Sequence, residues 1–118
     1  MINMALNLSN KVDIIELMEN YVERIRPPYH IRNKLDIGYK IDNQSIILHE
    51  IRPSFRDPNV VIEPEYAKVT YVKSEDKWKV YWRRANLKWT LYEPQPKVES
   101  LIDFIKLVDE DKFHCFKG

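Results

Sequence analysis

The change in hydrophobic period along the chain is the feature that most constrains its fold. Over residues 9–25 apolar side chains recur every three or four positions, which indicates an amphipathic helix that ends before Pro27-Pro28. Over residues 35–53 and 65–92 the period is two, which indicates β-strands, and over residues 98–108 the helical spacing returns. This order predicts an α+β fold, in which a five-stranded, mainly antiparallel meander sheet has an N-terminal and a C-terminal helix packed on one face.

Turn-forming residues divide the two strand regions. Asp42 and Asn43 form the predicted turn of the first hairpin, because both residue types tolerate the positive φ of a tight turn. In the second region, a four-residue turn over residues 74–77 and a two-residue turn at Ala85-Asn86 give three strands. Between the two regions, three prolines predict an irregular connection over residues 53–64.

The chain is long enough for one domain around one core. It has 118 residues, of which 44% are hydrophobic, so we expect a single domain over residues 1–118, with residues 1–8 flexible. The helical stripe predicted to face the core comprises Leu8, Val12, Ile15, Met18, Val22 and Ile25. Near the C-terminus, Phe113 and Phe116 are expected to dock onto the core.

Charge and cysteine content exclude several classes of function. The formal net charge is only +1, so no field of the whole molecule draws the protein to nucleic acid or to an anionic membrane, and we expect no membrane partner. Cys115 is the only cysteine, which excludes an internal disulfide and a zinc site of paired thiolates, and favours a reducing, cytoplasmic location. Gly38 and Gly118 are the only glycines, so a glycine-rich phosphate loop is excluded and we expect no cofactor.

The predicted turns determine which residues face one another across the second strand region. The two-residue turn places Trp82 opposite Trp89, and the four-residue turn places Lys68 opposite Arg83. One face of the sheet then carries Trp78, Trp82 and Trp89, which we expect in the core against the helices. The other face carries Lys68, Thr70, Val72, Lys79, Tyr81, Arg83, Lys88, Thr90 and Tyr92.

This second face is the candidate binding surface. Residues 65–92 hold seven Lys and Arg against three acidic residues, and like charges side by side in a sheet destabilise it unless something offsets them. Binders of single-stranded nucleic acid use such surfaces, because cations track phosphates and aromatic rings stack on bases. The candidate ligand-binding residues are Lys68, Lys79, Tyr81, Arg83, Lys88 and Tyr92. Alternatively, the face is only solvated, or acidic residues fold across it from Asp109-Glu110-Asp111 or from the first helix.

A second basic cluster precedes and enters the first strand. It consists of Arg24, Arg26, Arg32, Lys34 and Lys40, with only Asp36 opposing it locally. Two roles are open for this cluster, either to extend the candidate binding surface or to neutralise acidic residues elsewhere in the fold.

The sequence gives only a weak match to a catalytic pattern. Asp36 followed by Glu50-Ile51-Arg52 is similar to the acid and Glu-x-Lys of metal-dependent nucleases, in which two carboxylates hold a magnesium ion. The predicted hairpin instead pairs Asp36 with His49 and points Glu50 to the other face, so the metal site requires a register shifted by one residue. A general base at His49 would lack a nearby nucleophile. We therefore assign no catalytic residue and no metal.

Three functions remain open at this point. The favoured one is a non-catalytic binding module for an anionic ligand, with single-stranded nucleic acid as the first candidate. The second is a structural or protein-interaction domain that forms a homodimer through the tyrosine-bearing sheet face. The third is a metal-dependent, nuclease-like hydrolase at Asp36 and Glu50.

Several motifs together carry a family resemblance. They are Arg26-Pro27-Pro28, His30-Ile31-Arg32, Glu50-Ile51-Arg52-Pro53, Trp78-Lys79-Val80-Tyr81-Trp82, Lys88-Trp89, Tyr92, Pro94, and Cys115-Phe116 before Gly118. In this combination the chain resembles the bacterial family named domain of unknown function 3024, over nearly its whole length. The resemblance implies a small, usually stand-alone bacterial protein without an established activity, cofactor or catalytic residue, so it transfers no function.

Overall fold

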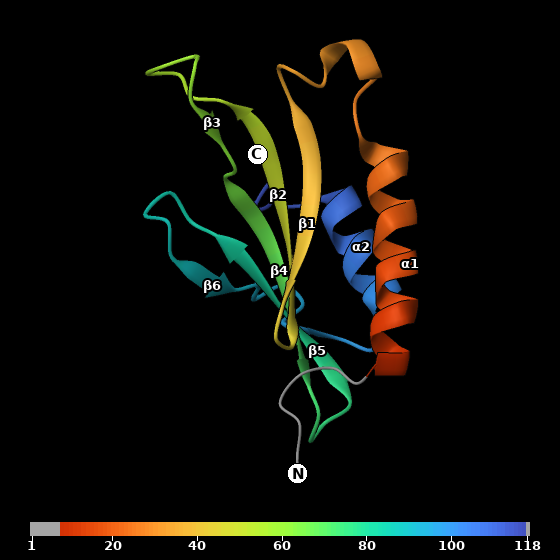
Figure 1. Ribbon diagram of the computed structural model, residues 1–118. Helices are drawn as coiled ribbons and strands as arrows, with labels where there is room; N and C mark the ends of the chain where they lie inside the picture. The colour runs from red at the N-terminus through yellow and green to blue at the C-terminus, as the bar shows by residue number, and fades with distance from the viewer. Residues whose placement is uncertain (1–7, 118) are drawn as a thin grey trace.

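The computed structural model of the protein describes residues 8–117 (Figure 1). In chain order its elements are α1 (Leu8–Ile25), the 3-10 helix η1 (Tyr29–Ile31), β1 (Asp36–Asp42), β2 (Ser45–Pro53), β3 (Val61–Ile62), β4 (Glu65–Val72), β5 (Lys77–Arg83), β6 (Trp89–Leu91), β7 (Lys97–Val98) and α2 (Leu101–Glu110). The expected flexibility of residues 1–8 lies outside the described residues except for Leu8, the first residue of α1.

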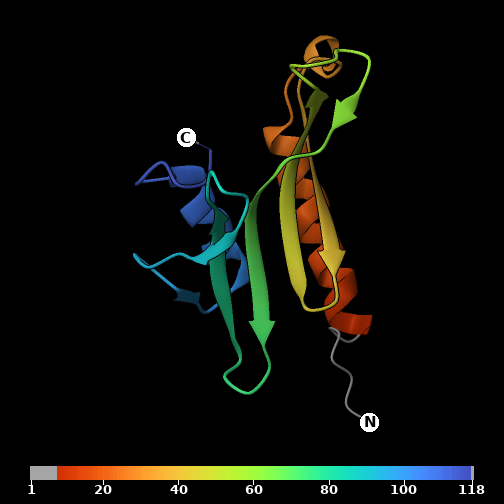
Figure 2. The same cartoon turned by 90° about the vertical axis from the view of Figure 1, so that its left-hand side faces the viewer.

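The predicted α+β fold is confirmed. An antiparallel sheet runs in the order β1-β2-β4-β5-β6, with β3 paired to β2 and β7 paired to β5. Figure 2 looks onto the sheet with both helices behind it, so α1 and α2 cover the same face. The connection over residues 53–64 is less irregular than predicted, because it contains β3. Its prolines still contribute to pairing, since the carbonyl of Pro64 accepts a hydrogen bond of 2.9 Å from the amide of Glu50.

The core lies between the sheet and the two helices. On α1 the buried side chains are Ile14, Met18, Tyr21 and Val22. The predicted stripe is wrong at Val12 and Ile15, which are 58% and 43% exposed. The helix contains adjacent apolar residues such as Ile14 and Ile15, so helical spacing alone allows two neighbouring stripes, and the position of the sheet selects one of them.

The C-terminal helix begins at a capped residue and ends in a docked tail. The hydroxyl of Ser100 accepts a hydrogen bond from the amide of Asp103, as expected of an N-cap. At the other end, the carboxylate of Asp111 accepts hydrogen bonds of 2.9 Å from the amides of Phe116 and Lys117. Phe116 is buried as predicted, whereas Phe113 is 54% exposed and the prediction for it is wrong. The carboxylate of Asp111 therefore directs one of the two rings into the core.

The registers of the first two hairpins are shifted by two residues from the prediction. The first turn is at Asn43 and Gln44 rather than at Asp42, and Asn43 has the positive φ of 58° that such turns require. In the second hairpin Val72 faces Lys77, so Lys68 faces Tyr81 and not Arg83. Because a shift of two residues preserves the alternation of faces, the residues of β1, β2 and β5, and those of β4 from Lys68 onwards, stay on their predicted side.

The register of the third hairpin differs from the prediction by an odd number of residues, so the side chains of β6 point to the opposite faces from those predicted. Its loop spans residues 84–88, with the amide of Arg84 bonded to the carbonyl of Lys88 and Leu87 at a φ of 65°. Arg83 therefore faces Trp89, and Trp82 faces Thr90. The prediction that Trp89 lies in the core opposite Trp82 is wrong, because the longer loop moves its indole to the side away from the helices.

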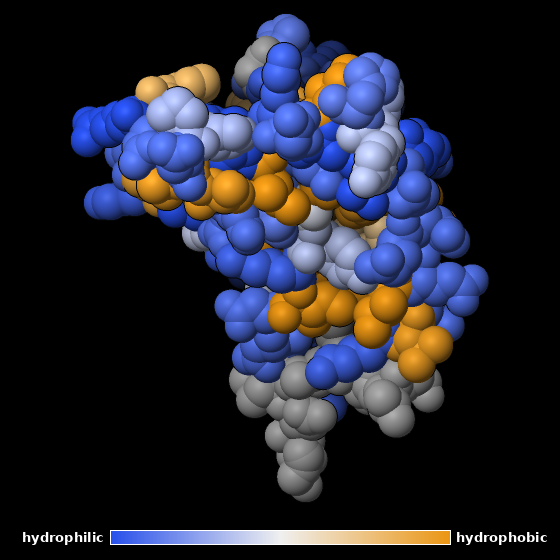
Figure 3. All heavy atoms as spheres, turned by 45° about the horizontal axis from the view of Figure 1, so that its top comes forward, coloured by the Kyte–Doolittle hydropathy of each residue, from blue (hydrophilic) through white to orange (hydrophobic). Residues whose placement is uncertain are grey.

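Exposed apolar side chains come from several parts of the described chain. In residues 8–117 no helix combines the length and the apolar character needed to cross a lipid bilayer. Exposed apolar residues such as Phe55 and Leu87 are far apart in the sequence, and Figure 3 shows apolar patches separated by hydrophilic side chains. Isolated exposed apolar residues of this kind are ordinary for a folded domain.

Candidate anion-binding face of the sheet

The open face is the side of the sheet that neither α1 nor α2 covers, and its residues follow from the strand register. One row crosses five strands and contains Lys40, Ile47, Lys68, Tyr81 and Leu91. The rows on either side contain Thr70 with Lys79, and Arg83 with Trp89. The open face points towards the viewer in Figure 2. Within residues 8–117 the two helices therefore leave uncovered a surface of mixed cationic and aromatic character.

Cations and aromatic rings pack together at the centre of the open face. The Nζ atom of Lys68 lies 4.9 Å from the ring centroids of both Tyr81 and Trp89. The guanidinium carbon of Arg83 lies 5.2 Å from the centroid of Trp89. Partial burial, with a smaller contribution from the charge of Arg83, lowers the pKa of Lys68 below its usual value. The negative faces of the two rings offset part of the repulsion between the cations.

Glu65 is the acidic residue that pairs with cations of the open face. Its carboxylate pairs with Nη1 of Arg83 at 2.6 Å and with the ammonium of Lys40. Burial by itself would raise the pKa of Glu65, but hydrogen bonds and charges from Lys40 and Arg83 outweigh it, so this pKa lies below its usual value. An acidic partner on the face was one of the predicted alternatives, but its source differs, because the acid belongs to β4. Asp109 instead pairs with Arg24 on the helical side.

A β-bulge places Glu65 on the open face. Strict alternation from Lys68 would point Glu65 towards the helices and Tyr66 away from them. The pairing of β2 with β4 shifts between Leu48 and His49, so that Glu65 lies opposite His49. Tyr66 is accordingly buried in the core. Alternation in the sequence carries no sign of this bulge, so Glu65 was not among the predicted site residues.

A cavity opens beside the pair of Glu65 and Arg83. It has a volume of about 310 Å³ and lies between the connection of β3 to β4 and the loop that joins β5 to β6. Its lining consists of Ile62, Glu63, Pro64, Glu65, Arg83 and Leu87. The Nε atom of Arg83 is buried and has no hydrogen-bond partner among residues 8–117. A small group that enters the cavity therefore meets a charged pair at one wall and apolar side chains at the others.

The structure brings four of the six predicted binding residues onto the open face. These are Lys68, Lys79, Tyr81 and Arg83. Lys88 is exposed in the loop before β6. Tyr92 is a correction, because its side chain is 2% exposed and packs on Phe116 with ring centroids 4.9 Å apart.

Trp89 takes the aromatic position that Tyr92 was predicted to hold. Each of the two residues fits a strand with period two, and only the length of the loop before β6 determines which of them faces outwards. Sequence reasoning therefore missed Trp89 as a site residue. The only signal that could have revealed the outward position of Trp89 is the length of this loop, which is five residues. That loop requires a positive φ at Leu87, and leucine rarely adopts a positive φ, so the residue types did not indicate it.

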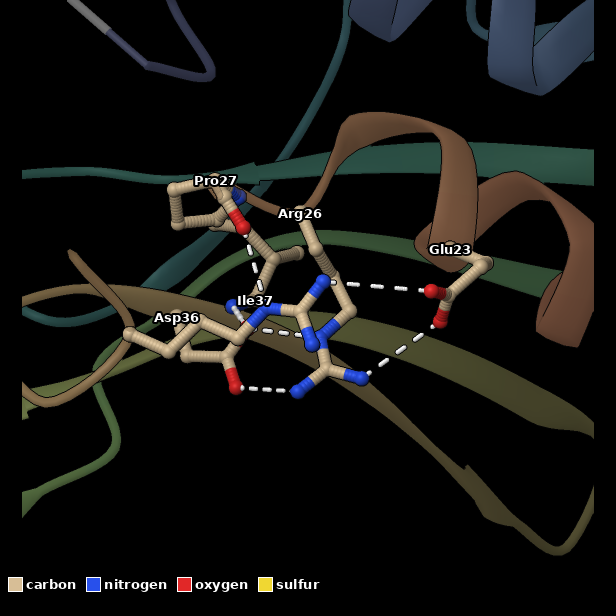
Figure 4. Close-up of polar contacts among 6 residues, drawn as sticks. Glu23, Arg26, Pro27, Asp36 and Ile37 are labelled. Carbon is tan, nitrogen blue, oxygen red and sulfur yellow. Dashed lines mark hydrogen bonds and ion pairs between the residues drawn. The ribbon is translucent and has the colours of Figure 1, made fainter. Parts of the chain in front are cut away.

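The second basic cluster mainly neutralises acidic residues, which was one of its two predicted roles. Arg26 donates two hydrogen bonds to the carboxylate of Asp36, at 2.9 and 2.7 Å, and also pairs with Glu23 (Figure 4). Arg24 pairs with Asp109, Arg32 with Glu23, and Lys40 with Glu65. The hydrogen bond from Arg26 holds the pKa of Asp36 below its usual value, although burial acts in the opposite direction. This contact joins the end of α1 to the start of β1.

The geometry required for the hydrolase hypothesis is not formed. Asp36 faces Ile51, so Glu50 points to the opposite side of the sheet, where it pairs with Arg52 at 3.2 Å. His49 faces Gly38 and not Asp36, as the shifted register requires. In the part of the chain that the structure describes, no three His, Cys, Asp or Glu side chains are grouped so as to hold a metal ion.

The pair of Arg26 and Asp36 predicts a pH-dependent loss of stability. We expect Asp36→Asn to lower the free energy of unfolding at pH 7 by about 1 kcal/mol, between the values of exposed and buried pairs. The pKa of Asp36 is lower in the folded state than in the unfolded state, so its stabilisation is present above about pH 4 and is lost as the pH falls further. Urea unfolding at pH 7 and pH 3 should show the difference between wild type and variant shrinking at pH 3. Equal differences at both pH values, or the same behaviour for exposed Asp13→Asn, would contradict this role.

The family described as "Domain of unknown function (DUF3024)" matches residues 7–118. No match was found among curated proteins or among solved structures.

Proposed function

Since this chain belongs to the DUF3024 family, whose description names no activity, we propose a function from the open face itself. The protein is a non-catalytic binding module for an anionic ligand, with single-stranded nucleic acid as the favoured ligand. The observation that carries the proposal is the cluster of Lys68, Tyr81 and Trp89 on the sheet face that lies opposite to α1 and α2. Its place would be the cytoplasm, where reducing conditions suit a chain whose only cysteine is Cys115.

The chemistry of single strands supports this choice over other anions. Tyr81 and Trp89 lie on adjacent strands in diagonal positions, since Tyr81 faces Leu91 and Trp89 faces Arg83. Two rings on one face can stack on neighbouring unpaired bases, which a duplex does not expose. Lys68 and Lys79 supply charge for phosphates, and neither makes an ion pair within residues 8–117.

The direct test is binding of a fluorescently labelled single-stranded oligonucleotide, followed by anisotropy as salt is varied. We expect binding at about 50 mM salt, weaker binding to the matching duplex, and a linear fall of log affinity with log salt. Lys79→Ala and Lys88→Ala together should reduce the steepness of this dependence by about 0.7 for each lost phosphate contact. The control is Lys106→Ala, an exposed lysine of α2 on the helical side.

Two outcomes would reject the nucleic-acid proposal. One is an absence of binding at about 50 mM salt, because low salt is the most permissive condition for contacts to phosphates. The other is a homodimer in light scattering that becomes monomeric in Trp89→Ala. A dimer of that kind would assign the open face to self-association, and the face would have no room for a ligand.

A further inference from the structure

Glu65 behaves as an internal anion within the open face. One oxygen of its carboxylate pairs with Arg83 of β5, and the other pairs with Lys40 of β1. The side chain of Glu65 is only 19% exposed, so this carboxylate fills the space between the two cations. A phosphate or carboxylate group of a ligand presents the same oxygen atoms to the same donors.

Arg83 keeps a buried donor that Glu65 does not satisfy. Glu65 accepts from Nη1 of Arg83, while the buried Nε has no hydrogen-bond partner in the described part of the chain. An unsatisfied donor of a charged group is costly, so it is a position where a further acceptor is favoured. Guanidinium groups commonly hold phosphate through two parallel hydrogen bonds, which use two nitrogens on one edge. Nε shares an edge of the guanidinium with Nη2, as in the pair of Arg26 with Asp36, so a ligand oxygen could accept from Nε beside the position that Glu65 holds at Nη1.

The cavity beside Glu65 and Arg83 gives a ligand access to this pair. Glu65 and Arg83 form part of its lining, and its apolar walls come from Ile62, Pro64 and Leu87. Its volume of about 310 Å³ is sufficient for a phosphate group with the sugar or base attached to it. An anionic group can therefore reach Arg83 from this side without any change in the strands.

We propose that Arg83 and Lys40 form the binding position for an anionic group of the ligand, and that Glu65 occupies this position until the ligand displaces it. The inference rests on the proposed function, because it describes how the ligand of the open face is held. It also makes Glu65 a competitor that lowers the affinity of the free protein, since displacing it reduces the observed binding.

The first test is anion rescue of Glu65→Ala, which does not depend on nucleic acid. Thermal unfolding is compared in chloride, acetate and inorganic phosphate at equal ionic strength. We expect phosphate and acetate to raise the Tm of the variant by about 4 °C more than that of the wild type when the anion is at about five times its Kd. The control is Glu75→Ala, which also removes a carboxylate paired with a lysine, Lys97, but is not part of the lining of the cavity beside Arg83.

The second test uses Glu65→Gln, which keeps the shape of the side chain. Its affinity for a 5′-phosphorylated and an unphosphorylated single-stranded oligonucleotide should rise by about tenfold, and Glu75→Gln should change it by less than about twofold. A gain confined to the phosphorylated strand would identify a terminal phosphate as the bound group, and an equal gain would identify an internal one.

The two proposals fail in different ways. Anion rescue of Glu65→Ala without oligonucleotide binding by any variant supports the anion position and rejects nucleic acid as the ligand. Oligonucleotide binding that is unchanged in Glu65→Gln, together with no selective rescue of Glu65→Ala, overturns the present inference. In that case Glu65 serves only to join β1, β4 and β5.

Discussion

Replacing both Tyr81 and Trp89 by alanine should weaken binding of a single-stranded oligonucleotide by at least about 30-fold. Each base stacked on an aromatic side chain contributes roughly 1–3 kcal/mol, so two lost stacking partners remove at least about 2 kcal/mol. The two rings also flank the ammonium of Lys68, which loses its fixed position when they are removed. Anisotropy titrations at about 50 mM salt measure the change.

The control for this double variant removes aromatic residues elsewhere. Tyr29 and Phe113 are 85% and 54% exposed, and Tyr29→Ala with Phe113→Ala should change the affinity by less than about twofold. The salt dependence should be preserved in the variant of Tyr81 and Trp89, because stacking involves no counterions. Stacking on the open face would be refuted by wild-type affinity in that variant, or by an equal loss in the control.

Gly38→Ala should lower the free energy of unfolding by about 1–3 kcal/mol, as overpacking of a filled site does. A Cβ atom on Gly38 would lie 2.8 Å from Cε1 and 3.0 Å from Nε2 of His49, which is buried on the neighbouring strand. In an ordinary strand the same substitution stabilises by about 0.5–1 kcal/mol, because glycine loses more backbone entropy on folding. The expected sign is therefore opposite to the usual one, and urea unfolding determines it.

A double-mutant cycle with His49 tests the cause. In a His49→Ala background the Cβ of residue 38 has space, so Gly38→Ala should become neutral or stabilising there. The same loss in both backgrounds would show that the close approach of His49 is not responsible. This contact also explains why a glycine stands in the middle of β1, where the sequence pattern alone favours a side chain.

The elements themselves could be predicted from the sequence, because hydrophobic period is a local property. The buried residues of α2, such as Phe104 and Val108, recur with helical spacing, and the side chains of β5 and of β4 from Lys68 onwards alternate with a period of two. The placement of Lys68, Lys79, Tyr81 and Arg83 on one face was predictable too, because the register of that hairpin was wrong only by an even number.

The composition of the site was not predictable in the same way. Trp89 lies on the open face and Tyr92 in the core, which is the opposite of the prediction. The register of the hairpin before β6 differs from the predicted one by an odd number of residues, and such a difference reverses every side chain of that strand. Loop length depends on the backbone conformations that the loop adopts, and Leu87 has a positive φ that residue type disfavours. The aromatic content of the open face was therefore a tertiary result.

Two helices, an antiparallel sheet and a cationic face could be read from the chain alone, because each follows from periods and residue types within a few neighbouring positions. The position of Glu65 between Lys40 and Arg83 follows instead from the assembled sheet. That contact needs a bulge in β4 and joins residues from three strands that are distant in the chain. Contacts between such residues depend on how the strands align in space, and the alternation of residues along one strand does not predict that alignment.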